Sequence, residues 1–291
     1  MSKAVIAIVK GGLGNQLFIY ATARALALRT QRHLYLDTKR GYVADAYGRS
    51  YRLDRFPIQA ESMPESWRVA PNLKHPWHKL VRAFNKLLPR GVRNYYAERS
   101  DWSAAQLVQL RPSRNRITLL GYWQDEGYFS DQATAIRAEL SPPVPVDARN
   151  QELGCRLAAS ASVFIHFRRV RYPNLLGRDY YQQAIDRVRH EIGPVNFVLF
   201  GDDLAWPRSN LDFGDSPVEA VEHNSADELA DLWLMTRCRH AIIANSSFSW
   251  WAAWLGGPAS SGRLILSPAE NGVRLLAASG WQRVSCRLDT A

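Results

Sequence analysis

Three clusters of small polar and basic residues follow apolar runs of the chain, and each has the composition of an anion-binding site. The clusters are residues 11–16 (Gly11, Gly12, Leu13, Gly14, Asn15, Gln16), residues 166–169 (His166, Phe167, Arg168, Arg169) and residues 245–249 (Asn245, Ser246, Ser247, Phe248, Ser249). Glycine lets a ligand approach the backbone, arginine clamps phosphate oxygens through two nitrogens, and small polar residues at a helix start add N–H donors. Together the clusters predict a phosphate-bearing substrate held between two α/β units.

Each cluster also has an ordinary structural interpretation. The glycines fit a tight strand-to-helix turn, the arginines fit surface ion pairs, and Asn245–Ser247 fits a helix cap. Trp250, Trp251 and Trp254 are more typical of core aromatics than of a sugar platform. The glycine cluster is neither a P-loop nor a dinucleotide fingerprint, because Leu17 stands where the third glycine is needed.

Carboxylates with the spacing of a metal–diphosphate site are missing from the sequence. Asp202 and Asp203 follow an apolar run, but no two aspartates stand two positions apart. We therefore expect no metal and no cofactor. The charge of a departing phosphate would be met by arginines and a helix N-terminus.

Apolar runs alternate with helical patterns, which predicts an α/β fold with mainly parallel sheets. The expected strands are residues 4–9, 33–36, 117–122, 162–167, 195–200, 217–221, 241–244 and 264–266. The expected helices are residues 15–29, 128–139, 180–191, 226–238 and 247–255. The proline-rich segment Ser141–Pro145 predicts two domains, residues 1–145 and residues 146–291, with a basic irregular region over residues 38–116 in the first.

The composition is that of a globular protein of 291 residues, with 46% hydrophobic and 22% charged residues. No apolar run reaches the roughly 18–20 residues of a membrane span. The N-terminus is typical of a first strand rather than of a signal peptide. Three widely spaced cysteines, Cys155, Cys238 and Cys286, favour reduced thiols and a cytoplasmic location.

Positive charge is concentrated in residues 38–116, which hold 16 Lys/Arg and 6 Asp/Glu and account for the whole net charge of +10. Within them, Trp77–Leu88 has an apolar helical face, with Lys79, Arg82 and Lys86 on the other face. This pattern predicts either an interfacial helix on an anionic membrane or a surface helix packed on the core. A nucleic-acid binder is the third class that the charge allows, but no nucleic-acid-binding module is recognisable, so we expect no nucleic-acid partner.

Taken together, the motifs resemble those of the bacterial α-1,2-fucosyltransferases, glycosyltransferase family 11. The family's Gly-Gly-Leu-Gly-Asn-Gln-Leu-Phe opening is matched from Gly11, its Gly-Tyr-Phe-Gln segment by residues 121–124, and its arginine motif by residues 166–169. The run from Leu234 to Trp254 matches closely, so the resemblance covers nearly the whole chain in order and spacing.

The resemblance implies a GT-B-like fold, with two Rossmann-like domains facing across a cleft, and an inverting, metal-independent transferase. GDP-β-L-fucose would be the donor, bound mainly by the second domain, and O2 of a terminal galactoside on a glycan or lipid-linked oligosaccharide would be the acceptor. Arg168 would bind the β-phosphate beside His166 and Arg169, and residues 245–249 would hold the nucleotide or diphosphate. Gly14 and Asn15 would meet donor and acceptor across the cleft. Apart from the resemblance, the cysteines predict a cytoplasmic chain, and the interfacial interpretation of Trp77–Leu88 predicts peripheral contact with the inner face of the membrane.

One departure from the family motif concerns the catalytic base. Where the family continues Arg-Arg-Gly-Asp-Tyr, this chain has Arg169, Val170 and Arg171. The missing aspartate would orient the arginines or serve the acceptor hydroxyl. Its role is either lost here or has passed to another residue, for which the candidates are Asp179, Asp125 and Glu126. The alternative is a GDP-sugar-binding protein of the same fold that takes another donor sugar or performs no chemistry.

Overall fold

The computed structural model describes residues 3–43, 45–68, 75–98, 103–170, 174–269, 277–286 and 288–290. The chain divides into two compact units, Met1–Ser141 and Pro142–Ala291. Each unit is a mixed α/β structure built on a parallel sheet, so the expected GT-B-like fold class of two Rossmann-like units is confirmed.

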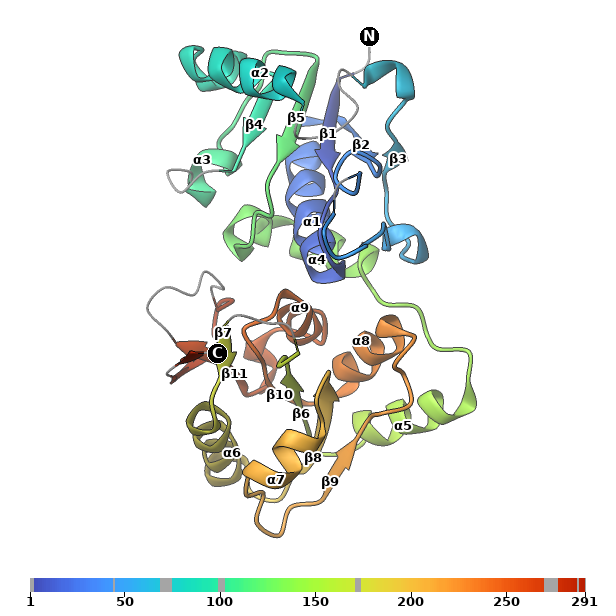
Figure 1. The fold of residues 1–291 in the computed structure, drawn as a ribbon, viewed down its shortest axis with the longest axis vertical. Helices are drawn as coiled ribbons and strands as arrows, with labels where there is room; N and C mark the ends of the chain where they lie inside the picture. Colours follow the sequence, from blue (N-terminus) through green and yellow to red (C-terminus); the bar gives the residue numbers. More distant parts are fainter. Residues whose placement is uncertain are drawn as a thin grey trace. The chain divides into compact units, whose positions relative to one another are not determined.

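The first unit has a five-stranded sheet in the order β3-β2-β1-β5-β4, with every neighbouring pair parallel (Figure 1). Its strands are β1 (Ala4–Ile8), β2 (His33–Asp37), β3 (Glu61–Ser62), β4 (Tyr95–Ala97) and β5 (Arg116–Leu120). Its helices are α1 (Leu13–Thr30), α2 (Pro76–Leu87), α3 (Ala104–Val108) and α4 (Ala133–Glu139). β1 is buried along its whole length, and α1 contacts both β1 and the helices α3 and α4. This explains why α1 is apolar around most of its circumference.

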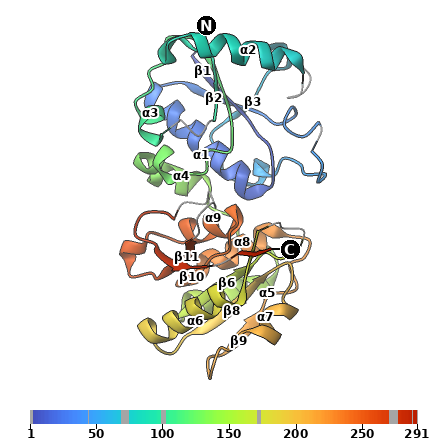
Figure 2. The ribbon, with the colours of Figure 1, turned by 60° about the vertical axis from the view of Figure 1, so that its left-hand side comes forward.

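The second unit has a six-stranded parallel sheet in the order β12-β11-β10-β6-β8-β9 (Figure 2). Its strands are β6 (Ser162–Phe167), β8 (Asn196–Gly201), β9 (Val218–Ala220), β10 (His240–Ile242), β11 (Ile265–Ala269) and β12 (Gln282–Ser285). Its helices are α5 (Ala148–Ala158), α6 (Arg178–Ile192), α7 (Ala205–Asn210), α8 (Glu228–Arg237) and α9 (Ser247–Leu255). A short antiparallel pair, β7 (Asn174–Leu176) with β13 (Leu288–Thr290), stands apart from this sheet.

The strand order of the second unit contains a change of direction between β6 and β10. From β6 the chain builds outward to β8 and β9, then returns to the other side of β6 for β10, β11 and β12. In open parallel sheets, ligands bind outside the carboxyl ends of the two strands where this reversal occurs. The first unit has the same kind of reversal between β1 and β5.

Aromatic packing anchors α9 in the second unit. Trp250, Trp251 and Trp254 are at most 1% exposed, and their rings stack or meet edge to face. The expectation that these tryptophans are core residues is therefore confirmed. Their burial fixes the direction in which the N-terminus of α9 points.

Some expected elements differ from the structure. The strand expected to reach residue 122 ends at Leu120, because Trp123 has a positive φ of 55° and Glu98 accepts hydrogen bonds from the Tyr122 and Trp123 N–H groups. Two 3₁₀ turns replace the first part of the helix expected over residues 128–139. Several further elements were not among those expected from the sequence, namely α3, α5, α7, β3, β4, β7, β12 and β13.

Candidate functional site

The second and third clusters meet at the carboxyl edge of the sheet in the second unit. Ile242 of β10 pairs with Ile165 of β6, so residues 166–169 and residues 243–249 continue from adjacent strand ends. On the other side of β6, Phe167 pairs with Gly201, and Asp202 and Asp203 follow directly. The reversal point of the sheet therefore carries two arginines, two aspartates and a helix N-terminus.

Arg168 is an accessible cation at this edge. Its side chain is 44% exposed, and its Nη1 atom lies 2.7 Å from Oδ2 of Asp202. The other oxygen of Asp202 accepts hydrogen bonds from the N–H groups of Arg169 (2.7 Å) and Val170 (3.2 Å). A guanidinium carries five N–H donors, so this ion pair orients Arg168 and leaves donors for an anion.

Arg169 is held differently. Its guanidinium lies 3.8 Å from the centre of the Trp206 ring, and its Nη1 atom donates to the carbonyl oxygen of Leu176 at 3.3 Å. Nε lies 3.9 Å from Oδ2 of Asp203. Successive side chains of an extended chain point in opposite directions, so Arg168 and Arg169 contact different groups. The contacts of Arg169 stabilise the loop after β6.

His166 is a buried, neutral group beside Arg168. Only 6% of the residue is exposed, and burial, followed by the charge of Arg168, lowers the pKa of its imidazole to about 3. Its Nδ1 atom is buried and has no hydrogen-bond partner among the described residues, while its ring centre lies 5.7 Å from that of Phe248. A neutral imidazole here can donate or accept one hydrogen bond without adding charge.

The N-terminus of α9 supplies the third part of the edge. Ser246 is its N-cap, and the Ser246 hydroxyl accepts from the Phe248 N–H at 3.3 Å. Asn245 and Ser249 are buried, and the Ser249 hydroxyl accepts from the Ala244 N–H and donates to the Ser246 carbonyl. Ser246, Ser247 and Phe248 are partly exposed. Of the predicted residues 245–249, these three are accessible to a ligand, whereas Asn245 and Ser249 are buried and the Ser249 hydroxyl stabilises the turn.

Two tyrosines that sequence reasoning missed fix the strand ends. The hydroxyl of Tyr180 donates to the carbonyl of Ile243 at 2.6 Å, and that of Tyr181 donates to the carbonyl of His166 at 3.1 Å. Both rings are buried, and burial raises the pKa of both hydroxyls well above 10. The aromatic pair at the start of a helix is visible in the sequence, but its partners lie in strands far along the chain.

In the first unit, the glycine-rich cluster and residues 121–124 lie together after the adjacent strands β1 and β5. The side chain of Gln124 donates to Oδ1 of Asn15 at 2.7 Å, and Nζ of Lys10 lies 4.3 Å from the centre of the Tyr122 ring. Gly14 and Asn15 belong to the first turn of α1, which has glycine as its N-cap and therefore no covering side chain.

Gln16 has a structural role in the same cluster. Its amide nitrogen donates to the carbonyls of Gly11 and Ser50, and its amide oxygen accepts from the Arg52 N–H. Gln16 is fully buried. It therefore ties the glycine turn to the segment 50–52 and is not exposed to a ligand.

The candidate bases lie at different places. Asp179 is an exposed residue in the first turn of α6, in the second unit. Asp125 and Glu126 are in the first unit, where the Asp125 carboxylate accepts from the Gly127 N–H at 2.8 Å and caps a 3₁₀ turn. Val170 is 47% exposed, and Arg171 lies outside the described residues.

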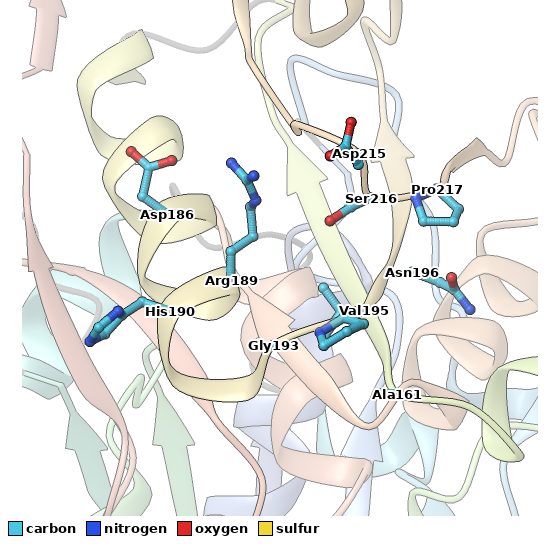
Figure 3. A pocket seen from close by; sticks show the side chains of 11 residues that line it. Ala161, Asp186, Arg189, His190, Gly193, Val195, Asn196, Asp215, Ser216 and Pro217 are labelled. Atoms are coloured by element: carbon cyan, nitrogen blue, oxygen red, sulfur yellow. The ribbon is translucent and has the colours of Figure 1, made fainter.

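Among the residues that the structure describes, no group of three or more His, Cys, Asp or Glu residues could hold a metal ion. A pocket of about 730 Å³ opens at the amino edge of the second unit's sheet, lined in part by Asp186, Arg189 and His190 of α6 (Figure 3). It lies at the opposite edge from Arg168, so it does not belong to the candidate site.

Comparisons with known proteins identify the family and the fold of the chain. The model of glycosyl transferase family 11 matches residues 4–266. An α-1,2-colitosyltransferase of Escherichia coli is 31% identical over 265 residues, which cover 86% of this chain and 87% of the relative. A galactoside 2-α-L-fucosyltransferase, SEC1 of Bos taurus, is 28% identical, with 89% of this chain and 69% of the relative covered. The structure of a FUT1 mutant from Arabidopsis thaliana in complex with GDP is similar in fold, with a TM-score of 0.53, 15% identity, and coverage of 93% of this chain and 71% of that chain.

Proposed function

The chain belongs to glycosyl transferase family 11, and from this premise we propose that it transfers L-fucose from GDP-β-L-fucose to a sugar hydroxyl, with inversion at the anomeric carbon. The acceptor that we propose is O2 of a terminal galactoside on a glycan or lipid-linked glycan, and the name of one relative, a galactoside 2-α-L-fucosyltransferase, supports the galactoside. The observation that carries the proposal is the convergence of Arg168, His166 and the N-terminus of α9 at the reversal point of one sheet.

This edge has the groups needed to stabilise a departing nucleoside diphosphate. Arg168 would bind the β-phosphate, with Asp202 holding its guanidinium in place. The N–H groups at the start of α9 would add a partial positive charge, and neutral His166 would add one hydrogen bond. These groups supply positive charge without a metal ion, so we propose a metal-independent reaction.

The proposed chemistry is a single displacement. The acceptor oxygen attacks the anomeric carbon on the face opposite GDP and forms the new glycosidic bond. The bond between that carbon and the β-phosphate oxygen breaks, and its electron pair stays on GDP. The hydroxyl proton passes to a carboxylate, for which Asp179, Asp125 and Glu126 remain the candidates. Asp125 already caps a turn, so its substitution would also disturb the chain around Gly127.

One observation supports colitose as an alternative donor sugar. The relative that is 31% identical is a colitosyltransferase rather than a fucosyltransferase. The test is to supply GDP-fucose and nucleotide-activated colitose separately with a β-galactoside acceptor and to compare kcat/KM. The proposal predicts the larger value for GDP-fucose and an α-1,2-linked product by NMR. A clear preference for colitose would mean that colitose, and not fucose, is the sugar transferred. The assignment of the phosphate site would not change.

Location and membrane contact are also proposals. No helix in the described part of the chain is long and apolar enough to cross a membrane. We propose a cytoplasmic enzyme that contacts the membrane peripherally, which would bring it to a lipid-linked acceptor. Fractionation of cells at low and high salt tests this proposal, since peripheral contact predicts a membrane fraction that high salt releases.

A further inference from the structure

The helix α2 in the first unit carries its apolar side chains on the outside. Leu80, Phe84 and Leu87 are 53%, 69% and 82% exposed, and Trp77 is 46% exposed. Residues at positions i, i+3, i+7 and i+10 share one side of a helix, so these four form a continuous row, here called the α2 face. Surface helices of globular proteins normally turn such a row toward the core. The second sequence interpretation, a helix whose apolar row packs on the core, is therefore wrong.

A polar residue holds α2 against the body of the first unit. Asn85 is only 7% exposed, and its Oδ1 atom accepts hydrogen bonds from the N–H groups of Asn94 (3.1 Å) and Tyr95 (3.3 Å). Its amide nitrogen donates to the carbonyl of Val81 at 2.8 Å. These bonds fix the rotation of α2 about its axis, and they keep the α2 face away from β4.

The segment that contains α2 is rich in positive charge. Residues 66–97 contain seven Lys/Arg and no Asp/Glu. Arg90 and Arg93 follow α2, and the Nε atom of Arg93 donates to the carbonyl of Leu88 at 2.8 Å. The exposed Arg114 binds the carbonyl of Val92 through its Nε atom at 3.1 Å. The side chains of Lys79, Arg82 and Lys86 lie outside what the structure describes, but these residues add three charges to the same helix.

From the exposed apolar row and the positive charge of this segment, we propose that the α2 face docks on an anionic lipid bilayer. Trp77, Leu80, Phe84 and Leu87 would enter the boundary between headgroups and acyl chains, while the basic residues contact lipid phosphates. A polyanion such as nucleic acid would match the charge but not the apolar row. A second copy of the chain would match the apolar row but would bring an equally basic surface against it.

The position of α2 constrains the acceptor, and this step rests on the proposed function. Asn85 binds the amino end of β4, so α2 lies at the amino edge of the sheet, as Figures 1 and 2 both show. The glycine-rich cluster is at the carboxyl edge, one five-residue strand or ~17 Å away. A lipid-linked acceptor would therefore present a sugar that stands well clear of the membrane surface.

Vesicle binding of the full chain tests the docking proposal directly. The protein is sedimented with vesicles of phosphatidylcholine alone and with vesicles that contain phosphatidylglycerol, and no donor or acceptor is present. We expect binding to the anionic vesicles that is weaker in high salt. The double variant Phe84→Ser/Leu87→Ser should bind at least about tenfold more weakly, because it removes exposed apolar side chains only.

The matched control is Val144→Ser/Val146→Ser, which removes two exposed valines outside α2 and should leave vesicle binding unchanged. Circular dichroism checks that both variants are folded. Equal binding to neutral and anionic vesicles, or undiminished binding by the α2 variant, overturns the proposal. The proposal is also overturned if the wild-type protein is a dimer that does not bind vesicles and the α2 variant is a monomer. Release of GDP with a soluble acceptor does not require a membrane, so it tests the proposed function separately.

Discussion

At the scale of single residues, the candidate donor site depends on how positive charge is held after β6. Arg168 is exposed and is oriented by Asp202, whereas Arg169 stacks on Trp206 and binds a carbonyl. His166 stays uncharged because it is buried next to Arg168. Among the described residues of this edge, the accessible guanidinium of Arg168 is therefore the group to which we assign most of the phosphate binding.

Substitution of Arg168 tests this assignment. Arg168→Ala should lower kcat/KM for the GDP-sugar by about 10²–10³-fold, because a charge-stabilising donor at the leaving group is lost. The control is Arg156→Ala, since Arg156 makes only a surface ion pair with Glu219, and its loss should leave kcat/KM within about twofold. Near-normal turnover of the Arg168 variant would show that Arg168 does not bind the phosphate of the donor.

The buried residue His240 makes the stability of the chain depend on pH. Burial, with the charges of Arg239 and Arg263, lowers the pKa of His240 to about 4, and its Nδ1 atom accepts a hydrogen bond from the Leu264 N–H. The unfolded chain binds a proton near pH 6.5 and the native chain near pH 4, so the free energy of unfolding falls as the pH drops through this window.

The variant His240→Asn keeps an acceptor atom but does not titrate. Urea unfolding at pH 7 and pH 4 should show that the loss of stability on acidification is smaller in the variant by about 3 kcal/mol. The same loss in both proteins would mean that His240 is not held neutral in the native state.

The sequence predicted the residue types of the site but not all of their partners. Arg168 and residues 245–249 follow apolar runs, which is a local pattern. The ion pair with Asp202 and the bond from Tyr181 to the His166 carbonyl depend on which strands and helices become neighbours. Strand order is a property of the whole sheet, so a local pattern does not contain it.

At the scale of elements, the close approach of β6 and β8 depends on a glycine. Gly201 has a φ of +152°, and a Cβ atom there would lie 2.3 Å from the carbonyl oxygen of Phe167. Gly201→Ala should therefore lower the free energy of unfolding by at least about 2 kcal/mol, as measured in urea.

Gly91→Ala is the matched control, because its nearest neighbour atom would lie 3.5 Å away and its φ is not positive. It should change stability by no more than about 0.5 kcal/mol. If the two variants are equally stable, the strand ends that carry Arg168 and Asp202 are not held as closely as described.

The bounds of helices and strands were predicted correctly where a long apolar pattern in the sequence defines them. They were predicted wrongly where a contact with a distant residue determines where the element ends. The strand Ser162–Phe167 and the helix Ser247–Leu255 have the expected bounds. β5 ends earlier than expected because Glu98, which follows the neighbouring strand β4, accepts hydrogen bonds from the N–H groups of Tyr122 and Trp123. The orientation of α2 was also not predictable, since the bonds of Asn85 and not hydrophobicity set it.

At the scale of the whole molecule, both units place their motif residues at the reversal point of a parallel sheet. In the first unit this edge offers amides, a lysine and uncapped glycine backbone. In the second it offers arginine, aspartate and a helix N-terminus. Because the arginine and the helix N-terminus lie in the second unit, we predict that this unit makes most of the contacts with the nucleotide.

Removal of divalent metal ions tests the chemistry of the whole enzyme. We expect the rate of transfer to be unchanged in excess chelator, because Arg168 and the α9 N-terminus would carry the charge that a metal would otherwise neutralise. Activity that is lost with chelator and restored by a divalent ion would count against this donor site.

The rate of GDP release by the purified protein with GDP-β-L-fucose, with and without a β-galactoside such as lactose, shows most directly whether the chain is a fucosyltransferase. We expect release that depends on the acceptor and yields a fucosylated product. Tight GDP binding without acceptor-dependent release, for both GDP-fucose and nucleotide-activated colitose, would show instead a GDP-sugar-binding protein with no transferase chemistry.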